Sequence, residues 1–246
     1  MQRRPLCAAL SAVCTLTAVT GCEVGNTAGA APAPSAIKTA AAVVTDTVAV
    51  SPQAPPQAPT AAEILAAAVT ATRTVNSAHV GYTATGYDTL TATTWSAEVT
   101  AAPPAATGSA GLLIDGQRTP TDFTVGGGRL VIQNVDGSRS DVGEATGVLN
   151  PPEILNRITG VAALLETVTD AAVADGPADL NGVPMQKLSG QIDATDLNLL
   201  LPTELLDSSQ SLPVTLWLDP VNGHTLRQLI ATTSNGAIVL DISPTS

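Results

Sequence analysis

Aromatic residues are scarce in this sequence, at 2% of its 246 residues, with one Phe, two Trp and two Tyr. The hydrophobic residues make up 44% of the chain, so the interior must be built mainly from Val, Leu, Ile and Ala. An aliphatic interior has few stacking platforms for nucleic-acid bases or sugar rings. We therefore do not expect a site that recognises its ligand by aromatic stacking.

Cysteine is also rare, and the three cysteines, Cys7, Cys14 and Cys22, all lie near the N-terminus. Arg3 and Arg4 precede an apolar run that is too short to cross a bilayer as a stable helix, as in an export signal. The run ends in Val19-Thr20-Gly21-Cys22, which resembles a bacterial lipobox. We predict a lipoprotein signal peptide at 1–21 and lipidation of Cys22; the alternative is an ordinary secretory signal with an incidental cysteine. No cysteine is then left for a disulfide.

Charged side chains are few between residues 23 and 59, where Ala, Thr, Pro, Val and Gln dominate. No pattern there could bury an apolar face, so we predict a flexible tether at 22–59 that spans on the order of 35 Å. The acyl chains on Cys22 would give durable attachment to the plasma membrane at its extracytoplasmic face.

Basic residues are few relative to acidic ones. Removing Arg3 and Arg4 from the ten Lys and Arg residues leaves eight against 21 Asp and Glu, a formal charge of −13. Nucleic acid and anionic head groups would repel such a chain, so membrane residence must come from Cys22 and no nucleic-acid partner is expected.

Groups suited to catalysis or metal binding are sparse. His79 and His224 are the only histidines, they show no metal-ligand spacing, and no G-x-S-x-G sequence is present. The stretch 136–141 lacks the glycine at the sixth position of a calcium loop and its distant bidentate glutamate, and Gly126-Gly127-Gly128 is typical of a hairpin turn. We expect a protein that is not an enzyme, with no catalytic residue, metal or cofactor.

The region 60–246 is predicted to fold as one α+β domain. Thr60 and Glu63 form a capping box for a helix of about sixteen residues. Nine or ten short strands follow as an antiparallel meander, with a hairpin at Asn181-Gly182 and a short helix at 197–201 stopped by Pro202.

The stretch Asn150–Val168 carries the longest helical signal among these strands. Its apolar residues Ile154, Ile158, Val161, Leu165 and Val168 share one helical face, with Asn150 as the N-cap and Pro151 at the first helical position. Gly160 interrupts the pattern, so either one kinked helix or two short helices would cover the sheet.

Strand alternation places Ala110, Leu112 and Ile114 on one face, while Asp115 marks the other as the outer face. Two alternatives remain open for the space under the helical cover: a packed core, or a cavity for a hydrophobic ligand. For a cavity, we predict a lining of Ala110, Leu112, Ile114, Phe123, Val125, Leu130, Ile132, Ile154, Ile158, Val161, Leu165 and Val168.

Several short runs occur in a characteristic order along the same region: 76–80 (NSAHV), 106–109, 121–123, 140–143, 149–155 (LNPPEIL), 159–162, 180–182, 188–190, 212–217 (LPVTLW) and 223–226 (GHTL). Taken together they resemble the mycobacterial LppX/LprG group of cell-envelope lipoproteins from about Thr60 to Ser243. The sequence departs from that pattern at Ser138–Asp141, where the usual tryptophan is absent.

The resemblance implies an antiparallel β half-barrel covered on its concave side by helices, with an apolar cavity between them. It further implies a monomeric, lipid-anchored carrier that moves acylated lipids or glycolipids across the periplasm toward the outer mycomembrane, with a membrane efflux transporter as a partner. The alternative is an envelope scaffold or adhesin whose head has a filled core and binds protein.

Overall fold

The computed structural model describes residues 57–134, 136–174, 178–201 and 210–245. These residues belong to one compact unit, Pro55–Ser246. The predicted signal peptide at 1–21, Cys22 and nearly all of the predicted tether lie outside the described residues.

The first element, α1 (Ala61–Arg73), is an amphipathic helix with the predicted capping box. Thr60 Oγ1 accepts a hydrogen bond from the Glu63 backbone N–H, and a Glu63 carboxylate oxygen accepts one from the Thr60 N–H. The hydrogen bonds that the Glu63 carboxylate accepts from the Thr60 backbone N–H and from the Thr60 hydroxyl hold the pKa of Glu63 below its ordinary value. The helix buries Ile64, Ala68, Val69 and Thr72, at the spacing of one helical face.

The described residues contain one 12-stranded antiparallel sheet. Its strands are β1 (Ser77–Thr85), β2 (Ala92–Ala101), β3 (Pro104–Ile114), β4 (Gln117–Gly126), β5 (Arg129–Gln133), β6 (Arg139–Glu144), β7 (Thr169–Val173), β8 (Ala178–Leu180), β9 (Val183–Asp193), β10 (Ser211–Asp219), β11 (Thr225–Thr232) and β12 (Ala237–Pro244).

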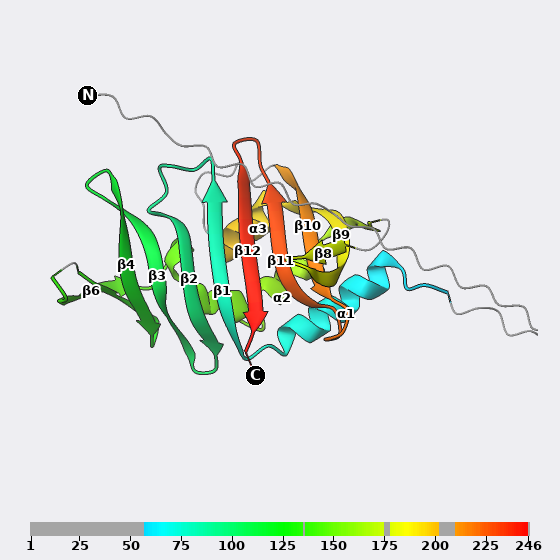
Figure 1. Cartoon of the computed structure of the whole chain (residues 1–246), viewed down its shortest axis with the longest axis horizontal. Helices are drawn as coiled ribbons and strands as arrows, with labels where there is room; N and C mark the ends of the chain where they lie inside the picture. The colour runs from blue at the N-terminus through cyan, green and yellow to red at the C-terminus, as the bar shows by residue number, and fades with distance from the viewer. Residues whose placement is uncertain (1–56, 135, 175–177, 202–209, 246) are drawn as a thin grey trace, which may run out of the picture. The chain divides into compact units, whose positions relative to one another are not determined.

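The strand order β6-β5-β4-β3-β2-β1-β12-β11-β10-β9-β7 runs from edge to edge without closing, while β8 pairs only with β9 (Figure 1). This confirms the predicted antiparallel half-barrel architecture. The last strand pairs with the first, from Ala78 opposite Pro244 to Thr85 opposite Ala237, so both halves of the chain share one continuous sheet.

The sheet has more strands than predicted, because short segments of low hydrophobicity join it as hairpin arms. β8 is only three residues long and forms the first arm of the predicted Asn181-Gly182 hairpin, where both residues have positive φ. Gly127 and Gly128 also have positive φ, in the hairpin turn predicted between β4 and β5.

The helical cover consists of short, separate segments: the 3₁₀ helices η1 (Gly147–Leu149) and η2 (Pro151–Leu155), and the α-helices α2 (Val161–Glu166) and α3 (Ala194–Leu200). Of the two forms expected for Asn150–Val168, the structure has two short helices, one of them 3₁₀. Pro151 lies at the predicted first position, but Asn150 makes no side-chain capping bond.

Asn156 and Gly160 explain the break. The Asn156 side-chain oxygen accepts a hydrogen bond from the Ile158 N–H at 2.9 Å, which turns the chain after η2. A Cβ atom on Gly160 would lie 2.4 Å from the Asn156 carbonyl oxygen, so this close approach admits only glycine. The chain therefore leaves the helical path between η2 and α2.

All three α-helices are tied to one side of the sheet. α1 packs on α2 and β11, while η2 packs on β2 and β3. Arg73 on α1 forms an ion pair with Glu166 on α2 at 2.7 Å. Figure 1 shows α2 and α3 behind β12 and β11. Buried apolar residues of the sheet and of the helices belong to one hydrophobic cluster.

Candidate functional site

The buried layer between sheet and helices is aliphatic and continuous. Eight of the twelve residues predicted to line a cavity are buried members of one hydrophobic cluster: Ala110, Leu112, Phe123, Val125, Leu130, Ile154, Val161 and Leu165. Ile132 and Val168 are partly buried and pack against the same cluster. Whether these side chains contact a ligand stays a prediction, but ten of them meet in one place.

Two of the predicted lining residues are exposed to solvent. Ile158 is 83% exposed, because η2 ends at Leu155 and the helical periodicity that placed Ile158 inward is broken. Ile114 is 42% exposed, because it is the last residue of β3, beside the Asp115-Gly116 turn. The prediction that Ile158 faces inward is wrong, whereas Ile114 shares the face of Ala110 and Leu112 but is not buried there.

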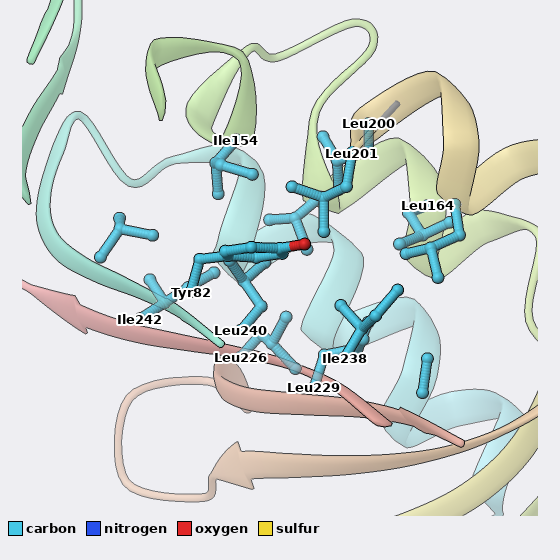
Figure 2. Packing of buried hydrophobic residues seen from close by; sticks show 14 of the residues in the cluster. Tyr82, Ile154, Leu164, Leu200, Leu201, Leu226, Leu229, Ile238, Leu240 and Ile242 are labelled. Atoms are coloured by element: carbon cyan, nitrogen blue, oxygen red, sulfur yellow. The ribbon is translucent and has the colours of Figure 1, made fainter. Parts of the chain in front are cut away.

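The C-terminal half, for which no lining residues are predicted, supplies much of the interior. Alternating residues of β10 and β12 are fully or almost fully buried, as are residues of α3: Leu212, Val214, Leu216, Leu218, Ile238, Leu240, Ile242, Leu197 and Leu200. The sequence contains a pattern that predicts this burial, since every second residue of 212–218 and 238–242 is aliphatic. Figure 2 shows residues from both halves meeting around Tyr82.

Three aromatic residues with a polar group are buried among the described residues: Tyr82, Tyr87 and Trp95. Tyr82 and Trp95 lie opposite each other on β1 and β2, with ring centroids 5.7 Å apart and planes at 16°. Tyr82 is 1% exposed and Trp95 4%. Within the described part of the chain, neither the Tyr82 hydroxyl nor the Trp95 Nε1 has a hydrogen-bond partner.

An unpaired buried donor costs about 1–3 kcal/mol of stability. Burial raises the pKa of Tyr82 to about 12, and the charge of the nearby Tyr87 adds to the rise. The Tyr82 hydroxyl therefore keeps its proton at neutral pH and remains a hydrogen-bond donor.

A hollow of about 320 Å³ opens on the helical side of the molecule. Its walls come from η2, the turn that follows it, α2 and α3: Glu153, Ile158, Thr159, Ala163, Leu164, Thr167 and Asp196. Leu164 is at once a wall of this hollow and a buried member of the interior cluster. The hollow thus borders the aliphatic layer, with carboxylates and hydroxyls around it.

The opposite face of the sheet has a polar groove of about 590 Å³ across β1 to β6. In it, Ser96 Oγ lies 2.8 Å from His79 Nε2, and His79 Nδ1 lies 2.8 Å from Glu98 Oε1. This is the order of a Ser-His-acid triad, and no sequence spacing predicts it, because only the strand register brings the three residues together.

Geometry argues against hydrolysis at this cluster. His79 and Glu98 side chains are 50% and 65% exposed, so water is not kept out. β2 is paired on both sides, so its backbone N–H groups serve the sheet ladder and leave no oxyanion donors beside Ser96. Elsewhere in the described residues, no three His, Cys, Asp or Glu residues gather as a metal site. None of the described helices is long and apolar enough to span a membrane.

Sequence comparisons identify relatives among mycobacterial lipoproteins. The lipoarabinomannan carrier protein LprG of Mycobacterium tuberculosis (strain H37Rv) is 32% identical over 158 residues, which cover 64% of this chain and 66% of LprG, just under two thirds of its length. The lipoprotein LprA of the same strain is 29% identical over 188 residues, covering 74% of this chain and 77% of LprA.

Solved structures agree on the fold. LprF from Mycobacterium bovis superposes with a TM-score of 0.67 at 26% identity, covering 74% of this chain and 91% of LprF. The lipoprotein LppX of Mycobacterium tuberculosis gives a TM-score of 0.56 at 24% identity, covering 73% of this chain and 93% of LppX. The profile of the LppX_LprAFG lipoproteins matches residues 60–246, and this chain therefore belongs to that lipoprotein family.

Proposed function

We propose that this chain is a lipid-anchored carrier that binds acylated lipids or glycolipids between its sheet and its helices. One observation carries the proposal. Beside the 13-residue α1, which packs on β11, the aliphatic inner face of the sheet is covered by separate helical segments of five, six and seven residues, η2, α2 and α3. Short segments joined by turns can separate to admit acyl chains, whereas a long helix would have to move as one body.

The binding step is a partition of acyl chains between two apolar environments. Each buried CH₂ group gains about 0.8 kcal/mol on leaving water, in the bilayer as in the protein interior. The two environments nearly balance, so lipid exchange is reversible. The head group stays outside the aliphatic layer, and the hollow beside Leu164, bordered by Glu153, Thr159 and Asp196, is the place we propose for it.

Transport follows from the anchor and the tether. Lipidation of Cys22 would hold the head at the extracytoplasmic face of the plasma membrane, and residues 22–59 would let it move above the bilayer. The name of LprG, a lipoarabinomannan carrier, supports this reading. We propose delivery across the periplasm toward the outer mycomembrane by a monomer, with a membrane efflux transporter as partner.

Native mass spectrometry of the full chain, produced in an actinobacterial host, tests the proposal. A carrier is expected to retain lipid adducts or to take up an added diacyl phospholipid. Repeated absence of adducts, together with no uptake of the phospholipid, would instead support the alternative function, an envelope scaffold or adhesin with a filled core.

A further inference from the structure

Two hydrogen-bond donors lie unused in the centre of the aliphatic layer. The Tyr82 hydroxyl and the Trp95 Nε1–H are buried, and no acceptor from the described residues reaches either of them. Figure 2 shows the Tyr82 oxygen directed toward the side of the interior where Leu164 and Leu201 lie, with Ile238 and Leu240 on the strand side. The labelled side chains on that side of Tyr82 are aliphatic.

Packing of the interior does not require the polar groups of Tyr82 and Trp95. A phenylalanine at position 82 would occupy nearly the same volume and stack equally well on Trp95, without a hydroxyl to desolvate. The other buried tyrosine, Tyr87, has a hydrogen-bond partner, because its hydroxyl donates to Thr233 Oγ1 at 2.5 Å. Buried donors without partners call for an acceptor that arrives from outside.

The chemistry of the acceptor is limited by its surroundings. The buried polar side chains among the described residues are Thr72, Thr121 and Thr225, none of them basic, so an anionic carboxylate or phosphate would be desolvated there without a counter-charge. A neutral carbonyl oxygen accepts a hydrogen bond without carrying charge. In acylated lipids such an oxygen lies at the head-group end of each chain, as part of an ester.

We propose that Tyr82 and Trp95 donate hydrogen bonds to ester carbonyl oxygens of the bound lipid. The inference rests on the proposed carrier function and narrows its ligand class to ester-linked lipids over ether-linked lipids and free hydrocarbons. The stacked pair, with centroids 5.7 Å apart, offers two neighbouring donors, which suits lipids with more than one acyl ester. An ester held there lies in the same layer as Leu164, behind the hollow proposed for the head group.

A matched pair of lipids tests this site. Dipalmitoyl phosphatidylcholine and its dihexadecyl ether analogue have the same head group and chain length but differ in the carbonyls. Each is titrated against a fluorescent acyl probe bound to the delipidated full chain. The wild-type chain is expected to bind the ester lipid about three- to tenfold more tightly, the range that one neutral hydrogen bond provides.

Tyr82→Phe is expected to lower this ester-to-ether ratio, with the Trp95 donor left in place, while leaving the melting temperature of the lipid-free chain unchanged or higher. Tyr87→Phe is the control: it breaks the bond to Thr233 and lowers the melting temperature, but keeps the ratio. Trp95→Phe is a second variant, expected to lower the ratio in part. An unchanged ratio in both the Tyr82 and Trp95 variants overturns the ester site. No binding of either lipid by the wild-type chain overturns the carrier function itself, and the two failures are therefore distinct.

Discussion

Thr72 on α1 and Leu226 on β11 are joined by a buried hydrogen bond, in which the Leu226 backbone N–H donates to Thr72 Oγ1 at 3.0 Å. The bond spans 154 residues of sequence. It is possible because the β10–β11 ladder shifts register between Trp217 and Leu218, so this part of β11 lies beside an irregularity in the ladder. This bond fixes α1 to the sheet near the C-terminal end of the helix.

Thr72→Val should destabilise the chain by about 1–3 kcal/mol, because it keeps the shape of the side chain but leaves the Leu226 N–H buried without an acceptor. Chemical denaturation measures the change. Thr72→Ser is the control, since it retains the hydroxyl and should cost less than the valine variant. A valine variant as stable as the serine variant would show that the bond contributes little.

Gly160→Ala should destabilise the chain, because the added Cβ would meet the carbonyl oxygens of Asn156, Ile154 and Glu153 at 2.4–2.7 Å. Backbone must then move between η2 and α2, and we expect a loss of about 1–3 kcal/mol. Gly126→Ala is the matched control, since no atom lies within 4 Å of the Cβ position and its φ is not positive. Equal melting temperatures for the two variants would contradict the close approach.

The local features of the fold could be predicted because their causes are local. The Thr60–Glu63 capping box, the Asn181-Gly182 turn and the alternation in β3 each depend on residues a few positions apart. The prediction for Ile158 failed because it also used local spacing alone. Helical spacing from Ile154 was extended through a segment in which Asn156 bonds the Ile158 and Thr159 N–H groups and Gly160 follows. Both breaking residues are visible in the sequence, but the apolar spacing was given more weight.

The candidate site was only partly predictable, because it depends on strand register. The stacking of Tyr82 on Trp95 requires β1 and β2 to pair with these residues opposite each other, and a shift by one residue would turn one ring outward. The Ser96-His79-Glu98 cluster depends on the same register. Nothing in the spacing of single residues along the chain gives that register, whereas the burial of Ala110 and Leu112 follows from alternation alone.

Alkaline pH should destabilise the wild-type chain through Tyr82. The pKa of Tyr82 in the folded chain is raised to about 12 from an ordinary value of 10.0. The contribution of the protonated hydroxyl to the free energy of unfolding is therefore fully present below pH 10 and is lost as pH rises toward 12. The loss amounts to roughly 1.4 kcal/mol per pH unit in that window. Tyr82→Phe lacks this titration, so the stability difference between the two proteins, measured by denaturation at pH 8 and pH 11, should shift toward the variant. A constant difference would contradict the buried, proton-bearing hydroxyl.

Cys22→Ala should block lipidation and leave the chain membrane-free or retained as an uncleaved precursor. We expect the anchor at this residue because the remaining acidic chain is repelled by anionic head groups. Metabolic labelling with a fatty-acid probe, followed by membrane fractionation, measures both effects. Cys14→Ala, which changes a cysteine inside the predicted signal, should still be labelled. Label retained by the Cys22 variant would refute the assignment of the anchor.

Ala110→Trp decides which face of the sheet takes up lipid. Ala110 is 4% exposed and faces the aliphatic layer, while its neighbour Ser109 faces the polar groove on the other side. If acyl chains enter the layer, the tryptophan occupies their space, so lipid uptake should fall several-fold at little cost in stability. If the layer is a filled core, the same change overpacks it and costs about 1–3 kcal/mol or more. The control, Ser109→Trp, adds equal bulk to the outer groove and should leave uptake unchanged. Thermal melting of the delipidated variants, paired with a fluorescent-lipid titration, separates the outcomes. A large fall in melting temperature with unchanged lipid uptake for Ala110→Trp excludes lipid binding at this face. Reduced uptake for Ser109→Trp alone places lipid binding in the groove.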